Sequence, residues 1–277
     1  MIFEYLDMII WPLLAALVLT GIHVYLGLHV VTRGVIFVDL ALAQVAALGT
    51  AVGILLGWEI NSGATYLLAL GFTFLGATLF SITRSLDERI PQEAIIGITY
   101  VVCTALMILL FSKSVEGAEH INHLLIGSIL FVTPGRVAAT FVLYSAIGLF
   151  HWRYRSQFMA ASRGNVSGDV NTRLWDFLFY MTFGFVVTSS VKIAGVLLVF
   201  SYLVIPAVGA LLFMNSIRSR LIFGWIFGVL GSLIGILSSL MFDIPTGAAI
   251  IVTFGLFLVV DIVWYLSLSG SNKKQVV

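Results

Sequence analysis

The stretch Ile-Ala-Gly-Val-Leu-Leu-Val-Phe-Ser-Tyr-Leu-Val-Ile-Pro-Ala-Val-Gly-Ala-Leu-Leu, residues 193–212, contains no charged side chain. A helix needs about 20 consecutive apolar residues to cross the hydrocarbon core of a bilayer, and this stretch has that length. Eight further stretches have the same character. The sequence therefore predicts an all-α polytopic membrane protein, with expected spans at 9–32, 35–57, 63–82, 93–112, 124–150, 174–191, 193–214, 221–241 and 246–268.

The number of spans depends on the fifth stretch, 124–150. Pro134, Gly135 and Arg136 interrupt it, and proline and charge both disfavour a continuous apolar helix. The segment is either a single span or a short re-entrant or interfacial piece followed by a shorter span. We therefore expect eight or nine transmembrane helices.

The composition excludes several other classes of protein. Of the 277 residues, 60% are hydrophobic and only 10% are charged, against about 25% charged in soluble domains. A net charge of +1 gives no basic field for nucleic acid. The single cysteine, Cys103, excludes an internal disulfide and a cysteine-rich metal cage. Residues 1–277 are predicted to form one transmembrane domain that ends in a polar tail, 269–277.

The basic residues predict the orientation in the membrane. Lys and Arg accumulate in cytoplasmic loops, and an external N-terminus puts 11 of the 14 basic residues on that side. We therefore expect the N-terminus outside and the C-terminus in the cytoplasm. The cytoplasmic set is Arg33, Arg84, Arg89, Arg153, Arg155, Arg163, Arg173, Arg218, Arg220, Lys273 and Lys274.

The longest polar stretch, 151–173, lies on the predicted cytoplasmic side. It is long enough for a short amphipathic helix lying on the membrane face. One interpretation is a solvated basic loop anchored by Trp152 and Tyr154, since basic interfacial helices are common. The other is a docking element for a cytoplasmic partner.

Polar side chains inside the spans are few, and each is expensive in hydrocarbon. Spans 1 and 2 are expected to form a hairpin that turns near Arg33. At about 1.5 Å per residue, His23 and Gln44 then share one depth, and His29 and Asp39 share a shallower one. Imidazole, amide and carboxylate groups suit a divalent cation such as Zn²⁺ or Mn²⁺. Hydrogen bonds that hold the hairpin together are the alternative.

Two further polar groups have structural and functional interpretations. Asp261 lies in the last span, where an arginine from a loop is the expected partner. The predicted outer loop 113–123 carries Glu116, Glu119, His120 and His123. His120 and His123 would share a face if the loop is helical, and could collect metal ions in a vestibule. A solvated loop explains the same residues.

Five elements, in order over about residues 10–265, resemble the zinc, manganese and iron permeases of ABC importers. Pro206-Ala207 within 193–212 matches the Pro-Ala of that family. The others are the arginine turn and polar helix at 33–49, Ala94-Ile-Ile-Gly-Ile-Thr-Tyr, Leu125-Ile-Gly-Ser-Ile-Leu, and Asp243-Ile-Pro-Thr-Gly-Ala-Ala-Ile.

This resemblance implies a fold, a function and partners. The fold would be a type II ABC importer-like bundle. The protein would lie in a bacterial inner membrane, surrounded by membrane lipid, and would work as a homodimer. Two cytoplasmic ATPase subunits would dock on it, and an extracytoplasmic metal-binding protein would deliver a divalent cation. That cation would be the substrate, with no permanently bound cofactor and no nucleic acid. ATPase docking would fall on Arg155, Gln157, Phe158, Met159 and Ala161.

The chain departs from the family pattern on the second span. The family commonly carries Asp-x-x-x-His there, whereas this chain has Leu40 and Gln44 at those positions, with Asp39 one residue early. On a regular helix, Asp39 and Gln44 lie about 140° apart. Either a distortion of the helix restores the pair, or His23 contributes from the first span. An amide oxygen in place of an imidazole favours Mn²⁺ and harder cations over Zn²⁺.

Two other functions remain as alternatives. The first is a transporter driven by an ion gradient, with Asp39 or Asp261 carrying protons. Such transporters often contain inverted repeats, and the sequence shows no convincing one. The second is a non-transporting membrane scaffold, which would need no polar groups such as His23 in mid-membrane. The absence of a Gly-Lys dipeptide excludes a P-loop, so this chain is expected to leave ATP hydrolysis to a separate subunit.

Overall fold

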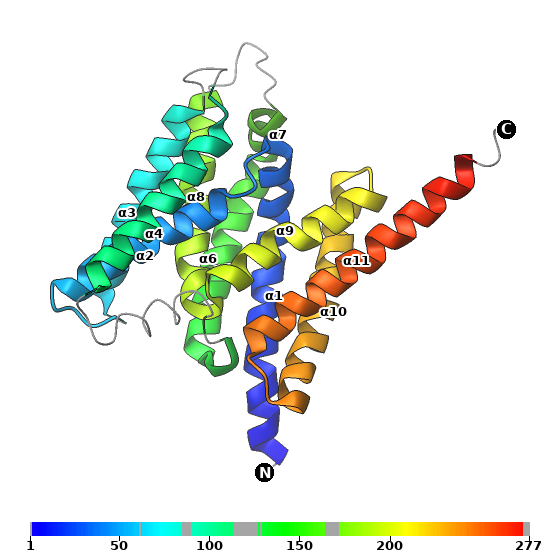
Figure 1. Cartoon of the computed structure of the whole chain (residues 1–277), viewed down its shortest axis with the longest axis horizontal. Coiled ribbons are helices and arrows are strands. Elements are labelled where there is room, and N and C mark those ends of the chain that lie inside the picture. Colours follow the sequence, from blue (N-terminus) through cyan, green and yellow to red (C-terminus); the bar gives the residue numbers. More distant parts are fainter. Residues whose placement is uncertain are drawn as a thin grey trace.

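The computed structural model describes residues 2–60, 62–84, 90–112, 127, 129–163 and 172–273. Every regular element within these ranges is helical (Figure 1). The elements are α1 (Ile2–Arg33), α2 (Val38–Leu55), α3 (Gly63–Thr83), α4 (Gln92–Phe111), the 3₁₀ turn η1 (Ile129–Phe131), α6 (Pro134–Arg153), α7 (Arg155–Arg163), α8 (Thr172–Ala194), α9 (Val196–Phe213), α10 (Ile217–Phe242) and α11 (Thr246–Lys273).

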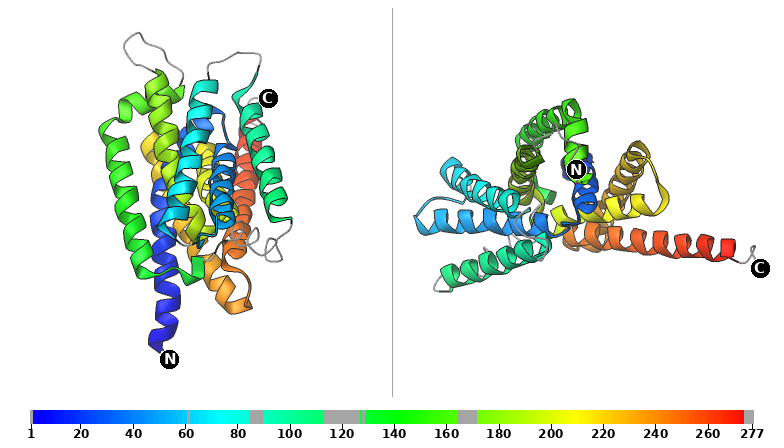
Figure 2. Two further views of the ribbon diagram at one scale, coloured as in Figure 1. Left: turned by 90° about the vertical axis from the view of Figure 1, so that its left-hand side faces the viewer. Right: turned by 90° about the horizontal axis from the view of Figure 1, so that it is seen from above.

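Eight of the described helices are long and apolar enough to cross a membrane: α1, α2, α3, α4, α8, α9, α10 and α11. Helix α6 is not among them, yet it is 20 residues long. It runs from the end of the molecule where α4 finishes to the end where α8 begins (Figures 1 and 2). The two chain termini lie at opposite ends, as an odd number of crossings requires. With α6 added to those eight, the described helices cross the molecule from end to end nine times.

Pro134 begins α6 rather than breaking it. Proline is well tolerated in the first turn of a helix, because the backbone N–H that it lacks has no acceptor there. The expected fifth span, 124–150, is thus divided. Its described part consists of η1 and a helix that starts ten residues later than the expected span.

The described helices contain an inverted repeat that the sequence did not reveal. Helix α2 packs on α3 and α4, as α9 packs on α10 and α11, and α3 packs on α8 as α10 packs on α1. Corresponding helices of α1–α4 and α8–α11 run in opposite directions (Figure 1). Gly34 and Gly195, with φ angles of 69° and 76°, occupy the same joint in the two halves. The two halves therefore share the arrangement of their helices, although the sequence shows no convincing repeat.

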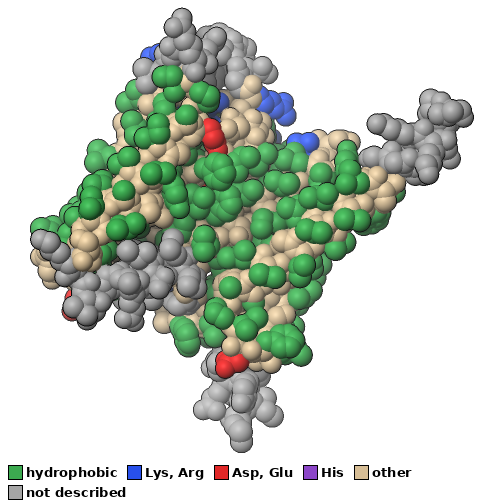
Figure 3. Space-filling view, viewed as in Figure 1, with side chains coloured by type: hydrophobic (Ala, Val, Ile, Leu, Met, Phe, Trp, Pro, Cys, Tyr) green, Lys and Arg blue, Asp and Glu red, His purple; other side chains and the backbone are tan. Residues whose placement is uncertain are grey.

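The face seen in Figure 3 is almost entirely hydrophobic, and its Lys and Arg side chains are confined to the end that carries α7. Beneath such surfaces the helices approach closely at glycines. A Cβ atom at Gly27 of α1 would lie 1.9 Å from the carbonyl oxygen of Leu203 on α9. A Cβ atom at Gly235 of α10 would lie 2.6 Å from the Cα of Ile250 on α11. The chain is a multi-pass membrane protein with a tightly packed interior.

Candidate functional site

The predicted pairing of polar side chains across an α1–α2 hairpin is wrong. Helix α1 packs mainly against α9, α10 and α6, whereas α2 packs against α3 and α4. His23 Nε2 lies 3.3 Å from Ser190 Oγ on α8, and its Nδ1 lies 2.8 Å from the Leu19 carbonyl oxygen. The expected pairing required α1 and α2 to lie side by side and antiparallel. The left-handed turn at Gly34 instead directs α2 away from α1.

Helix α2 buries two polar side chains that have unused hydrogen-bonding atoms. Asp39 is completely buried, and neither of its carboxylate oxygens has a hydrogen-bond partner. Gln44 is 2% exposed, and its Oε1 also lacks a partner. The helix is continuous from Val38 to Leu55, so no distortion brings the two side chains onto one face. An unpaired carboxylate in a membrane interior is costly, and either a bound proton or a bound cation would relieve that cost.

Tyr144 of α6 lies beside His23. Its ring stands edge-on to the His23 imidazole, with 6.0 Å between the centroids. The Tyr144 hydroxyl lies 3.1 Å from Ser189 Oγ. Sequence reasoning missed Tyr144 and Ser190 because neutral hydroxyl groups leave the hydropathy of a span almost unchanged.

Within the described ranges, no three or more His, Cys, Asp or Glu side chains gather closely enough to hold a metal ion. The two histidines of the predicted vestibule, His120 and His123, lie outside the described residues. The described interior therefore offers single ligands such as Asp39, Gln44 and His23 in different places.

The amphipathic helix expected within 151–173 is present as α7. It lies at one end of the bundle, between the end of α6 and the start of α8 (Figure 1). Phe158 and Ala161 face the interior, with exposed fractions of 0% and 1%. Arg155 is exposed, and Gln157 and Met159 are half-buried. The five residues expected to dock an ATPase thus divide between an inward and an outward face.

An ion cluster holds the ends of α1, α3 and α8 together beside α7. The Asp176 carboxylate of α8 accepts a hydrogen bond from Arg33 Nη1 at 2.7 Å and another from Arg84, which follows α3. The Arg33 side chain is completely buried, and its guanidinium carbon lies 3.9 Å from the centre of the Phe179 ring. Sequence reasoning missed Asp176, although an acidic residue near the start of a span, three residues after Arg173, was a usable signal.

The same cluster binds α7 directly. Ser162 Oγ lies 2.8 Å from His29 Nδ1 and 3.0 Å from Arg33 Nε, and both contacts join α7 to α1. Arg84 Nη2 donates to the Ala161 carbonyl oxygen at 2.9 Å. These contacts mean that α7 cannot shift without affecting the ends of three other helices.

Asp261 of α11 lacks the arginine partner that the sequence suggested. Its Oδ2 is buried without a hydrogen bond, and the described residues include no ion pair to it. The same atom would lie 3.2 Å from a Cβ placed on Gly209 of α9. A small residue on α9 therefore makes the room that this carboxylate occupies.

Comparison with known proteins places this architecture. The family model described as the ABC 3 transport family matches residues 5–265. The manganese transport system membrane protein MntC of Listeria innocua is 24% identical over 274 residues, covering 91% of this chain and 89% of the relative. A probable iron transport system membrane protein of Haemophilus influenzae is 24% identical over 259 residues, covering 91% and 92%.

A solved structure shares the fold. PsaBC from Streptococcus pneumoniae, determined in complex with Fab, superposes with a TM-score of 0.77 at 23% sequence identity. The match covers 94% of this chain and 95% of that one. The helical arrangement is therefore common to both proteins.

Proposed function

The chain belongs to the ABC 3 transport family, and from this we propose that it is the permease subunit of an ATP-driven importer for Zn²⁺, Mn²⁺ or Fe²⁺. The single observation that carries a cation path is Asp39, a fully buried carboxylate with no hydrogen-bond partner on either oxygen. The names of the relatives, which refer to manganese and iron, support the same class of substrate.

The chemistry of α2 favours a hard divalent cation. A carboxylate at Asp39 and an amide oxygen at Gln44 are oxygen ligands, which suit Mn²⁺ better than Zn²⁺. His23 already has a hydrogen-bond partner at each ring nitrogen, so it would join the path only after releasing Ser190. Because Asp39 and Gln44 are buried within one protomer, the helices around α2 must separate to admit an ion.

Helix α7 would transmit the conformational change of a bound ATPase subunit to the transmembrane helices. Its outward residues Arg155, Gln157 and Met159 would contact a cytoplasmic ATPase subunit, while Phe158 and Ala161 anchor it to the bundle. The complete importer would contain two copies of this chain, two ATPase subunits and an extracytoplasmic metal-binding protein. The N-terminus would lie outside the bacterial inner membrane and the C-terminus in the cytoplasm. The chain itself would be no enzyme.

The test is metal uptake by vesicles that contain this chain and its ATPase, with ⁵⁴Mn²⁺ at limiting concentration. Asp39→Asn should lower uptake at least about tenfold, because the cation loses its only buried carboxylate on α2. Thr50→Ala is the matched control, since it removes a polar group of α2 that already bonds to the Ala46 carbonyl oxygen. Uptake by the Asp39→Asn variant at the rate of the control would contradict the proposed path.

The inverted repeat keeps a gradient-driven transporter as the second candidate, since many such transporters are built that way. The two functions differ in one condition of the same assay. Uptake that persists in vesicles without any ATPase, and that follows an imposed proton gradient, would favour the second candidate. The hydrogen bonds that join α7 to the ion cluster at the ends of α1, α3 and α8 favour the ATP-driven importer.

A further inference from the structure

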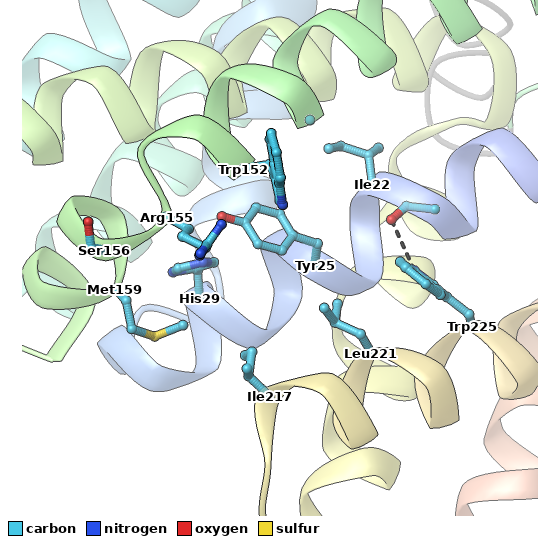
Figure 4. A pocket seen from close by; sticks show the side chains of 12 residues that line it. Ile22, Tyr25, His29, Trp152, Arg155, Ser156, Met159, Ile217, Leu221 and Trp225 are labelled. Atoms are coloured by element: carbon cyan, nitrogen blue, oxygen red, sulfur yellow. Dashed lines mark hydrogen bonds between the residues drawn. The ribbon is translucent and has the colours of Figure 1, made fainter.

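A groove runs along α1. Its first part lies between α6 and α7 on one side and α10 on the other (Figure 4), and its second part is lined by α1 and α6. It consists of two cavities of about 530 and 440 Å³. The cavities share Gly21, Ile22 and Gly148, so they lie next to each other along α1. Neither the path around α2 nor the ion cluster at Asp176 accounts for this space.

The groove has the length and lining of a hydrocarbon site. Along α1 it extends from His29 to Leu14, which is 15 residues at about 1.5 Å each, or about 22 Å. Half of a hydrocarbon core is about 15 Å thick, so the groove spans one leaflet and continues past the midplane. Its walls are mainly apolar and include Leu17, Phe141 and Leu221.

One end of the groove is polar and basic. Arg155 and Ser156 line it from α7, and the Arg155 guanidinium carbon lies 5.8 Å from the centre of the Trp152 ring. Trp225 lies farther along the groove, near its middle, where its indole N–H donates to the Gly21 carbonyl oxygen at 3.1 Å. Tryptophan and arginine together are typical of the level of lipid headgroups.

His29 adds an unused hydrogen-bond acceptor at this end. Ser162 Oγ lies 2.8 Å from the Phe158 carbonyl oxygen and 2.8 Å from His29 Nδ1. When the serine proton goes to that carbonyl, the imidazole donates to Ser162 from Nδ1. Nε2 is then an acceptor, and it has no partner although the side chain is 98% buried. A hydroxyl group that enters the groove beside Arg155 would supply the missing donor.

We propose that the groove binds one anionic phospholipid from the leaflet that contacts α7. The phosphate lies at Arg155, a headgroup hydroxyl reaches toward His29, and an acyl chain follows α1 past Gly21 and Gly148. Charge complementarity selects this occupant, because a cytoplasmic leaflet is negatively charged and Arg155 stands at the mouth. Phosphatidylglycerol has the required negative phosphate and free hydroxyl groups.

The two glycines keep the groove open. A Cβ atom at Gly21 would meet no atom within 4 Å, and one at Gly148 would lie 4.0 Å from Ile22 Cδ1. This differs from Gly27 or Gly235, where a neighbouring helix fills the space. A leucine at Gly21 or Gly148 would therefore extend into the groove without a clash between helices. Gly71 of α3, which also has no atom within 4 Å and lies outside the groove, provides a matched control.

The test measures retained lipid and does not involve transport, so its failure is separate from failure of the proposed function. Protein is equilibrated with vesicles of equal phosphatidylglycerol and phosphatidylcholine, extracted in mild detergent and analysed by native mass spectrometry. Wild type and Gly71→Leu should each retain one phosphatidylglycerol. Gly21→Leu and Gly148→Leu should reduce that retention about tenfold, which corresponds to about 1.4 kcal/mol.

Arg155→Gln tests the headgroup contact and leaves the apolar walls of the groove unchanged. The assay uses this chain without an ATPase subunit, so the proposed contact of Arg155 with that subunit does not affect the result. It should abolish the preference for phosphatidylglycerol over phosphatidylcholine while leaving a lipid bound. Equal retention by Gly148→Leu and Gly71→Leu would overturn the proposal, and so would a wild-type protein that shows no preference between the two lipids. If the leucine variants do not yield folded protein, the comparison of wild type with Arg155→Gln decides the question.

Discussion

The Phe158 ring of α7 lies flat on the imidazole of His151, with 3.9 Å between the ring centroids and 3° between the planes. His151 belongs to α6, and its Nε2 lies 2.8 Å from Thr182 Oγ1 on α8. Its Nδ1 lies 3.3 Å from the Tyr25 hydroxyl on α1. One aromatic ring therefore connects α7 to three helices of the bundle.

We predict that Phe158→Ala separates ATP hydrolysis from transport. Loss of a buried phenyl ring costs about 3–5 kcal/mol, and the alanine would leave α7 without contact to His151. Uptake of ⁵⁴Mn²⁺ should fall at least about tenfold, while the bound ATPase continues its basal hydrolysis. Phe158→Leu keeps most of the volume and should retain most of the uptake. Full uptake by the alanine variant would show that the ring is not needed for coupling.

Removing the charge of Asp176 should destabilise the fold. Asp176→Asn leaves the buried Arg33 guanidinium without its counter-ion, and breaking a buried pair costs about 3–5 kcal/mol. Arg84→Gln should cost less, because the Arg84 side chain is 19% exposed and Arg33 still neutralises the carboxylate. Thermal unfolding in detergent would measure both variants. The order is the critical result, and a larger loss for Arg84→Gln would contradict it.

Glycine-to-alanine substitutions should divide by location. Gly27→Ala would place Cβ 1.9 Å from the Leu203 carbonyl oxygen, so it should force α1 and α9 apart and lower the yield of folded protein. Gly97→Ala on α4 meets no atom within 4 Å and should be neutral or stabilising by up to about 1 kcal/mol. Size-exclusion profiles and unfolding temperatures of the two variants provide the comparison.

Gln44→His should change the choice of metal. The substitution replaces an amide oxygen on α2 with an imidazole nitrogen, which binds Zn²⁺ better. Uptake of ⁵⁴Mn²⁺ in the presence of competing Zn²⁺ should therefore become more sensitive to the competitor, by about tenfold for a ligand change worth 1.4 kcal/mol. Gln44→Asn keeps the amide and serves as the control. Equal sensitivity of the two variants would mean that the cation does not contact this position.

Much of the fold follows from the sequence, and the exceptions have physical causes. Apolar length alone predicts eight of the crossing helices, such as α2 and α9, within a few residues. It is ambiguous for α6, because Pro134 and Arg136 lower the hydropathy of a helix that the connectivity requires to cross.

Less of the candidate site than of the fold could be predicted from the sequence. The amphipathic helix at 155–163 was expected from its polarity and is present. The polar pairs across spans 1 and 2 were wrong, because adjacency in sequence does not fix packing and Gly34 redirects the chain. Asp176 and Tyr144 matter through partners more than thirty residues away. These partners depend on tertiary structure, so the sequence around either residue does not identify them.

The inverted repeat has a mechanical consequence when it is considered together with α6 and α7. Because the two halves have the same helix arrangement in opposite orientations, they present similar ends to the two sides of the membrane. The repeat alone therefore does not distinguish one side from the other. The described segment α6–α7 stands between the two halves in the sequence, and it places the helix α7 at one end of the molecule only. In the proposed importer, an ATPase subunit docked on α7 would therefore act on the bundle from one side of the membrane only.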